Sequence, residues 1–286
     1  MMLIDNRLEA CSTLNRQILS RLFAANVEAV AMPVADHREQ LGELESRSVS
    51  RMVEKRLREY STGRYCAHKA LQATLTADQA SSCNVSHYDI AIGSEREPCW
   101  PDGVRGSIAH TNDIAAAVVT NDPACRSLGL DIEPLQQLED GVLKIIADQE
   151  ELTAVYQQLE QQLQFAGSWA VCDESNTGHL PETAACLVFS AKESIFKCLF
   201  PVYRHWLDFR EVRVLLEELS VTQCDVTSTA AGLNNNAAGM GECWQGHFRA
   251  ELTGGCAAAI DVGQLRGQFA VLHGFVVTTA ELTTEP

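Results

Sequence analysis

The stretch Phe189–Pro201, FSAKESIFKCLFP, combines an apolar segment with three charged residues, Lys192, Glu193 and Lys197, within about two helical turns. Ser190 and Glu193 have the spacing of a capping box, in which each side chain bonds the backbone of the other residue, so we expect a helix to begin near Ser190. Lys197 follows Glu193 at i,i+4, a pairing that stabilises a helix by only about 0.2–0.5 kcal/mol. Taken alone, the stretch therefore fits a capped surface helix as well as a helix that carries chemistry.

The composition is typical of a globular chain. Its 286 residues, 46% hydrophobic and 21% charged, are enough for one large domain or for two domains of about 140 residues. No apolar run reaches the ~18 residues of a membrane-spanning helix, and the N-terminus carries acids where a signal peptide would carry a basic segment. We therefore expect a cytoplasmic protein without a membrane-spanning segment.

Charge and cysteine usage exclude two further classes of protein. A net charge of −16 argues against a general nucleic-acid binder, which needs a basic footprint. The 11 cysteines form neither CxxC pairs nor Cys/His zinc spacings, so we expect most of them to be reduced core residues. Positive charge is nevertheless concentrated locally, since seven of the 22 lysines and arginines lie between residues 47 and 69. This concentration indicates a local anion site.

Residues 50–75 are predicted to form one long helix, or two short helices that meet near Gly63, because apolar residues recur on one face at helical spacing. Arg56 and Arg64 lie about two turns apart on this helix, so both can point the same way. A solvated helix face explains the same two arginines without any ligand.

Between residues 88 and 133, short apolar segments separated by Gly, Pro, Asn and Asp predict β-strands. The last three of these segments are expected to pair as an antiparallel meander, because turn-forming residues join them. The predicted strands are 88–92, 106–110, 114–120 and 128–132.

The rest of the chain repeats this order of elements. Residues 136–166 are predicted to be helical, with strands at 209–216 and within 244–277, and with polar loops at 173–181 and 226–241. Each half then has a helix followed by roughly three strands. The pattern indicates an α+β fold made of two similar halves, related by duplication, at residues 1–134 and 135–286.

The segment Gly129–Glu133, GLDIE, would place two carboxylates side by side. In a strand, residues i and i+2 share a face, so Asp131 and Glu133 project together while their apolar neighbours enter the core. Adjacent carboxylates repel each other unless a cation lies between them, and hard oxygen ligands suit Mg²⁺. An edge strand that ends in solvated acids explains the same pattern without a metal.

Four segments in a fixed order are more specific than any one of them. They are KRLREYSTGR from Lys55, REPCWPDGVRGSIAH from Arg96, LGLDIE from Leu128 and FSAKESIFK from Phe189. Together they resemble the 4′-phosphopantetheinyl transferase superfamily, most closely its bacterial siderophore-synthetase type. The resemblance covers residues from about 50 to 200, and the proline-tryptophan loop and the FSAKE helix are its most discriminating parts.

The resemblance implies an enzyme that transfers the 4′-phosphopantetheine arm of coenzyme A to a serine of an apo acyl, peptidyl or aryl carrier protein, with release of 3′,5′-ADP. Siderophore and nonribosomal peptide biosynthesis are pathways that use such carriers. The implied cofactor is Mg²⁺, with Mn²⁺ as the alternative ion, and the implied fold is two α+β halves with the ligand between them. We expect the enzyme to be a monomer.

The resemblance also assigns roles by motif position. Catalysis is expected from Glu193, Lys197 and His110, with Glu193 taking the proton of the acceptor serine. The expected binding residues are Arg56 and Arg64 for the 3′-phosphate and its surroundings, Arg96 for the phosphate or adenine side, His110 and Lys197 for the other phosphates, and Asp131, Glu133 and Glu193 for the metal ion.

Two departures from the family pattern and two other functions remain. The family often has a serine or threonine before the motif histidine, whereas this chain has Ala109 before His110, and its polar segment 173–181 is longer than expected. A non-catalytic module that binds coenzyme A or another nucleotide would use the same residues. A magnesium-dependent nucleotide pyrophosphatase would use them with water as the acceptor.

Overall fold

The computed structural model describes residues 26–50, 52–75, 89–168, 180–223 and 242–284, together with Cys11, Leu14 and residues 18–24. The predicted loop 226–241 and most of the predicted loop 173–181 lie outside this part of the chain. The elements of the N-terminal region are η2 Leu19–Leu22, β1 Glu28–Pro33, η3 Arg38–Gln40, α2 Glu43–Val49, α3 Glu54–Thr74, β2 Ala91–Ile92, β3 Pro98–Cys99, β4 Arg105–His110 and β5 Ile114–Thr120. Those that follow are β6 Cys125–Pro134, α5 Asp140–Ile146, α6 Gln149–Phe165, α8 Leu180–Tyr203, η6 Phe209–Glu211, β7 Val212–Gln223, β8 Glu242–Leu252, η7 Gly254–Ala258, β9 Leu265–Leu272 and β10 Phe275–Thr283.

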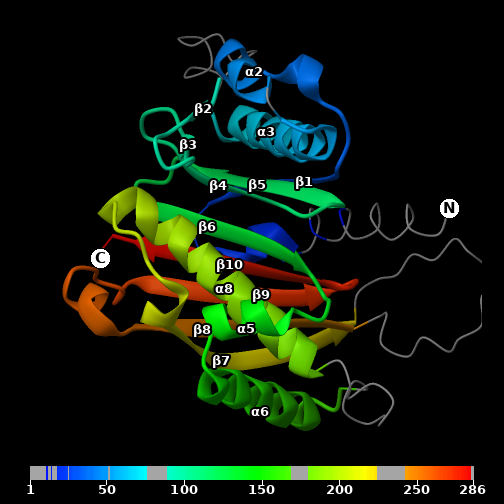
Figure 1. Ribbon diagram of the computed structural model, residues 1–286, viewed down its shortest axis with the longest axis vertical. Helices are drawn as coiled ribbons and strands as arrows, with labels where there is room; N and C mark the ends of the chain where they lie inside the picture. Colours follow the sequence, from blue (N-terminus) through cyan, green and yellow to red (C-terminus); the bar gives the residue numbers. More distant parts are fainter. Residues whose placement is uncertain are drawn as a thin grey trace, which may run out of the picture.

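Two antiparallel sheets form the framework, and the helices cover their outer faces (Figure 1). The smaller sheet has the strand order β1-β5-β4, and α3 packs on one of its faces through small residues such as Ala67 and Ala70. The larger sheet has the order β6-β10-β9-β8-β7, with α8 and α6 on one face. The fold is therefore α+β with helices packed on antiparallel sheets, as predicted.

A shared apolar layer joins the two sheets. The face of β5 that points away from α3 contributes Ile114 and Val118, and β6 contributes Leu128 and Leu130 to the same cluster. The N-terminal segment enters this layer as well, through buried residues such as Leu14. Because one core serves both sheets, α3 and α8 are held on opposite sides of it.

The pairing partner of strand β6 differs from the one that the expected meander would give it. β4 and β5 pair as predicted, from Arg105 opposite Thr120 to His110 opposite Ala115. β6 instead pairs with β10 in the larger sheet, from Cys125 to Pro134. The prediction of a three-stranded meander is thus wrong in its last strand, because local turn signals cannot reveal a partner strand at the far end of the chain. A boundary at residue 134 would assign β6 to the N-terminal half, although its hydrogen bonds lie in the larger sheet.

The helix that contains FSAKE begins at Leu180, and Ser190 lies in its middle. The Ser190 side chain is buried, and its Oγ shares a hydrogen bond of 2.9 Å with Thr278 Oγ1 of β10. The predicted capping box and helix start are therefore wrong. The apolar run before Ser190 is a fully buried helical segment, and a short apolar run does not distinguish a strand from a buried helix.

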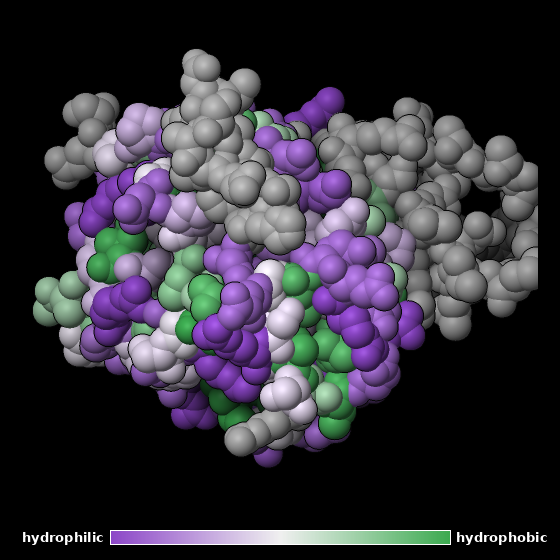
Figure 2. All heavy atoms as spheres, turned by 90° about the horizontal axis from the view of Figure 1, so that it is seen from above, coloured by the Kyte–Doolittle hydropathy of each residue, from purple (hydrophilic) through white to green (hydrophobic). Residues whose placement is uncertain are grey.

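The helices α2 and α3 lie at the upper end of the molecule in the view of Figure 1. Figure 2 shows that hydrophilic and hydrophobic residues are intermixed where this side is visible.

In the part of the chain that the structure covers, none of the helices combines the length and the apolar character that crossing a bilayer requires.

Gly129 fixes the distance between β6 and α8. A Cβ atom added at Gly129 would lie 1.8 Å from the carbonyl oxygen of Ser194 and 2.9 Å from the backbone nitrogen of Cys198. Both atoms belong to the α8 backbone, which cannot give way as a flexible side chain can. The missing side chain therefore allows the strand that carries Asp131 to touch the helix that carries Glu193.

The substitution Gly129→Ala should push α8 away from β6. We expect the free energy of unfolding to fall by about 1–3 kcal/mol, the usual cost of overpacking a core, measured by urea unfolding. Gly141→Ala is the matched control, since nothing lies within 4 Å of a Cβ at Gly141. Equal stability of the wild type and Gly129→Ala would show that this contact does not constrain the fold.

Candidate active site

A cavity of about 490 Å³ lies where β4, β6 and α8 meet the loop around β3. One part of its wall is aromatic and the other part is charged. The aromatic part is made by Trp100, Phe189, Phe196 and Phe200, and the charged part by Arg56, Glu95, Arg96, Glu97, His110, Asp131, Glu133, Glu193 and Lys197. The cavity thus contains seven of the eight residues to which the sequence assigned a role.

The buried carboxylate of Asp131 is only half satisfied. Its Oδ1 accepts a hydrogen bond of 2.5 Å from Lys197 Nζ, and the two side chains form an ion pair. Its Oδ2 is buried and has no hydrogen-bond partner. A buried acceptor without a partner is costly, so this oxygen suits a ligand that supplies positive charge.

Glu133 and Glu193 lie in the same electrostatic environment. The pKa of Glu133 is raised to about 8, chiefly by burial and also by the Asp131 carboxylate, against the opposing effect of Lys197. Burial also raises the pKa of Glu193, with Lys197 opposing and Asp131 contributing. The two carboxyl groups are therefore held in a partly desolvated site with excess negative charge, where a proton or a cation stabilises them.

Lys197 is the counter-charge of this cluster. Burial lowers its pKa, but the carboxylates of Asp131, Glu193 and Glu133 outweigh burial and raise the pKa overall. One ammonium faces three carboxylates, which leaves negative charge for a further cation to balance.

The three carboxylates fit a divalent cation in charge and in donor type, because hard oxygen ligands and an unpaired Asp131 Oδ2 are what Mg²⁺ requires. As they stand, however, no three His, Cys, Asp or Glu side chains in the described part of the chain are grouped closely enough to hold a metal ion. Closing the site around an ion would need movement of these side chains.

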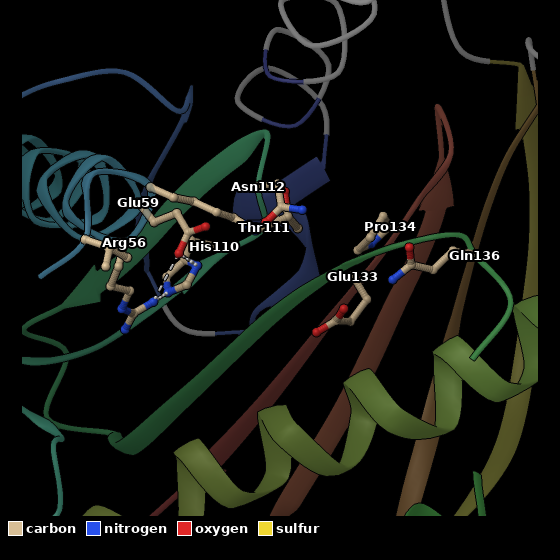
Figure 3. A pocket seen from close by; sticks show the side chains of 10 residues that line it. Arg56, Glu59, His110, Thr111, Asn112, Glu133, Pro134 and Gln136 are labelled. Carbon is tan, nitrogen blue, oxygen red and sulfur yellow. Dashed lines mark hydrogen bonds and ion pairs between the residues drawn. The ribbon is translucent and has the colours of Figure 1, made fainter. Parts of the chain in front are cut away.

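His110 lies between the charged groups of α3 and those of β6. The Arg56 Nη1 atom contacts His110 Nε2, and Glu59 Oε2 lies 3.8 Å from His110 Nδ1 (Figure 3). The pKa of His110 is lowered to about 4, chiefly by burial and also by the positive charges of Arg56 and Lys197. His110 is therefore neutral near pH 7. Because a guanidinium can only donate, Nε2 accepts and the ring proton lies on Nδ1, facing Glu59.

A second hollow of about 460 Å³ adjoins the first and shares Arg56, His110 and Glu133 with it. Figure 3 shows the residues of α3 and β4 on one side of this hollow and Glu133, Pro134 and Gln136 on the other. A ligand that extends through both would lie between the smaller and the larger sheet.

Of the two predicted binding residues Arg96 and Arg64, only Arg96 lines the cavity. Arg96 lines the cavity, and its backbone has a φ of 71°, in the left-handed region that non-glycine residues rarely adopt. Arg64 does not line either cavity described above; it is buried beside Tyr60, with its Cζ 5.1 Å from the centre of that ring. The structure thus brings Arg56 and Arg96 to the cavity and leaves Arg64 buried beside Tyr60.

Three features in and around the site were not predicted from the sequence. Lys192 lies in the FSAKE motif but is fully buried, where its Nζ donates to Glu151 Oε2 and to the carbonyls of Ile146 and Phe209. The aromatic wall was not recognised, although phenylalanines recur along the α8 sequence. Glu97 of the cavity pairs with Arg204, which follows α8, and this contact joins two distant segments.

The neutral state of His110 predicts a pH dependence. Its pKa is lower in the folded protein than in the unfolded chain, so the unfolded chain binds more protons and stability falls as the pH drops from about 6.5 towards 4. Between pH 6.5 and 5.5 the loss is about 1 kcal/mol. Urea unfolding of the wild type and of His110→Gln would measure it.

His110→Gln should lose this part of the pH dependence, whereas the exposed control His205→Gln should keep it. Identical pH dependence in all three proteins would show that His110 titrates normally.

Comparison with known proteins identifies the family to which the chain belongs. The family model of the 4′-phosphopantetheinyl transferase N-terminal domain matches residues 44–120, and the model of the 4′-phosphopantetheinyl transferase superfamily matches residues 127–239. The 4′-phosphopantetheinyl transferase PptT of Mycobacterium tuberculosis is 30% identical over 236 residues, which cover 82% of each chain. The chain belongs to the 4′-phosphopantetheinyl transferase superfamily. As a 4′-phosphopantetheinyl transferase it transfers the 4′-phosphopantetheine group to carrier proteins.

Other members match over shorter ranges. The 4′-phosphopantetheinyl transferase Svp of Streptomyces mobaraensis is 32% identical over 173 residues, which cover 60% of each chain. Enterobactin synthase component D of Escherichia coli is 33% identical over 107 residues, which cover 37% of this chain and 42% of that relative. The predicted superfamily is thus confirmed, while the similarity to the siderophore-synthetase type extends over less of the chain than the similarity to PptT.

Proposed function

We propose that this 4′-phosphopantetheinyl transferase takes the arm from coenzyme A, transfers it to a serine hydroxyl of an apo acyl, peptidyl or aryl carrier domain, and releases 3′,5′-ADP. The observation that carries the proposal is the cavity in which Asp131, Glu133 and Glu193 face Lys197, with His110 and Arg56 on the opposite wall. Carboxylates on one side and cations on the other suit a pyrophosphate that is bound together with a metal ion.

The proposed metal ligands are Asp131, Glu133 and Glu193. Asp131 Oδ2 is free of protein partners, and the raised pKa of Glu133 shows how much the site gains from added positive charge. When bound, Mg²⁺ would neutralise charge on the pyrophosphate oxygens, and Mn²⁺ prefers similar ligands.

The proposed proton acceptor is Glu193. The serine oxygen forms a bond to the β-phosphorus of coenzyme A, the bond from that phosphorus to the bridging oxygen breaks, and 3′,5′-ADP leaves with the bridging oxygen. The serine proton passes to Glu193, whose raised pKa makes it a better base than a solvated carboxylate. Lys197 and Arg56 would neutralise the charge that develops on the phosphates, and the neutral His110 would donate or accept a hydrogen bond there.

The proposed setting is a monomer in the cytoplasm, where the eight free cysteines of the described chain would stay reduced.

Carrier domains are usually acidic, so the net charge of −16 opposes their approach, and docking must use local basic or apolar surface. The family relatives include enterobactin synthase component D, which makes a siderophore or nonribosomal peptide carrier a first choice of substrate. We further propose that the chain consists of two halves related by duplication, residues 1–134 and 135–286, with β6 at the end of the first half pairing into the larger sheet.

The proposal predicts that the intact protein, given coenzyme A and Mg²⁺, raises the mass of an apo carrier domain by one phosphopantetheine arm. A panel of siderophore, polyketide, fatty-acid and nonribosomal peptide carriers, read by mass spectrometry, would identify the acceptor. No mass increase on any of them would contradict the proposal. Release of 3′,5′-ADP without a carrier would indicate a pyrophosphatase instead.

In the same assay, Asp131→Asn should lower kcat/KM by about 100-fold or more, because it removes a carboxylate ligand of the proposed metal ion that would neutralise the charge on the phosphates. Glu139→Gln is the matched control, since this exposed carboxylate lies outside the cavity. Near-normal turnover of Asp131→Asn would remove Asp131 from the site.

A further inference from the structure

The face of α3 that lies beneath α2 buries two hydrogen-bond donors without partners. The hydroxyl of Tyr60 is one of them, in a residue that is 8% exposed, and the Nη1 atom of Arg64 is the other, in a residue that is 5% exposed. The two groups are adjacent, since the Arg64 Cζ lies 5.1 Å from the centre of the Tyr60 ring. Native proteins rarely leave buried donors unpaired, so this pair needs an explanation.

Among the described residues, Arg64 has no carboxylate partner. Glu45 of α2 acts electrostatically on Tyr60, but its Oε2 accepts from the Gly42 N–H, and its Oε1 contacts His68 Nε2 and accepts from the Ile90 N–H. Glu45 is thus fully engaged by other donors, and none of the acidic side chains that the structure describes forms an ion pair with Arg64. A buried guanidinium without a counter-ion is costly, and an oxyanion with several acceptor oxygens would satisfy both donors.

The geometry connects this pair to the active-site cavity. Arg56, Tyr60 and Arg64 follow one another at four-residue intervals, which places them along one side of α3 at about 6 Å per step. Arg56 lines the cavity. A ligand that is bound at Arg56 and extends along α3 would therefore reach Tyr60 before Arg64.

We infer that the Tyr60 hydroxyl donates a hydrogen bond to the 3′-phosphate of coenzyme A, beside the contact expected from Arg64, and that Tyr60 thereby sets the preference for coenzyme A over 3′-dephospho-coenzyme A. The inference rests on the proposed function, because it takes coenzyme A as the ligand of the cavity. Burial raises the pKa of Tyr60 against the lowering effect of the neighbouring Arg64 and Ser48 side chains, so its hydroxyl stays protonated near neutral pH. Arg64 and Ser48 lie beside the hydroxyl, but neither meets it in hydrogen-bond geometry, so it remains available as a donor. A phenylalanine at this position would keep the ring under the guanidinium and remove only the donor.

Tyr60→Phe tests this role by the KM values for two substrates and by the melting temperature of the ligand-free protein. The KM for coenzyme A should rise about tenfold, the effect of one hydrogen bond to a charged group, while the KM for 3′-dephospho-coenzyme A stays within twofold of the wild type. The ligand-free variant should melt at the same temperature as the wild type or higher, because it no longer buries an unpaired hydroxyl. A purely structural role would instead lower the melting temperature and change the KM values for coenzyme A and 3′-dephospho-coenzyme A equally.

Tyr65→Phe is the matched control on the same helix, since the Tyr65 ring stacks on His37 with 4.4 Å between the ring centres. It should leave both KM values unchanged. Equal losses for the two donors in Tyr60→Phe, or an unchanged KM for coenzyme A, would overturn the inference.

Calorimetric binding of 3′,5′-ADP and of 5′-AMP separates this inference from the proposed function, because neither measurement needs turnover. The wild type should bind 3′,5′-ADP more tightly than 5′-AMP, and Tyr60→Phe should reduce that preference about tenfold. A preference that the variant retains in full, or that the wild type lacks, would overturn the role of Tyr60 even in an enzyme that modifies carriers. Failure to modify carriers, with the preference intact and sensitive to Tyr60, would contradict only the proposed reaction.

Discussion

The approach of β6 to α8 at Gly129 is the constraint on which the site depends. A side chain at this position would overlap the Ser194 carbonyl, so only glycine lets the strand and the helix touch. The contact brings Asp131 of β6 within 2.5 Å of Lys197 of α8. It also explains why Glu133 and Glu193 influence the pKa values of the same cluster, although they lie on different elements.

The shared core places a second set of charges opposite this cluster. β4 is held against the larger sheet, where the Ser107 Oγ accepts a hydrogen bond of 3.0 Å from the Leu130 N–H. His110 at the end of β4 and Arg56 on α3 therefore face the carboxylates of β6 across the cavity. The carboxylates with Lys197 on one wall, and Arg56 with the neutral His110 on the other, suit the metal ion and pyrophosphate that we propose as ligands.

Part of this arrangement could be predicted from the sequence. The alternation in GLDIE predicted that Asp131 and Glu133 share a face, because that pattern depends only on the period of a strand. The helical spacing of residues 50–75 predicted α3, which spans Glu54–Thr74. The order of the four motifs predicted the family, since it adds information that no single segment holds.

The remainder depends on contacts that the sequence does not display. The Ser190–Glu193 spacing predicted a helix start, but Thr278 of a distant strand binds Ser190 in the middle of a buried helix. The partner of β6 is the last strand, and Glu151 of another helix satisfies Lys192. Each of these residues is polar and close to a motif, and its role is decided by a partner far away in the chain.

We propose that Asp131, Glu133 and Glu193 close around one divalent cation when coenzyme A binds. A crystal structure of the complex with coenzyme A and Mn²⁺, in which the anomalous signal locates the ion, would test this arrangement. The ion is expected in direct contact with oxygens of all three carboxylates, with Lys197 turned from Asp131 towards a phosphate. An ion held elsewhere, with the Lys197–Asp131 pair still closed and Asp131 Oδ2 without a ligand, would contradict it.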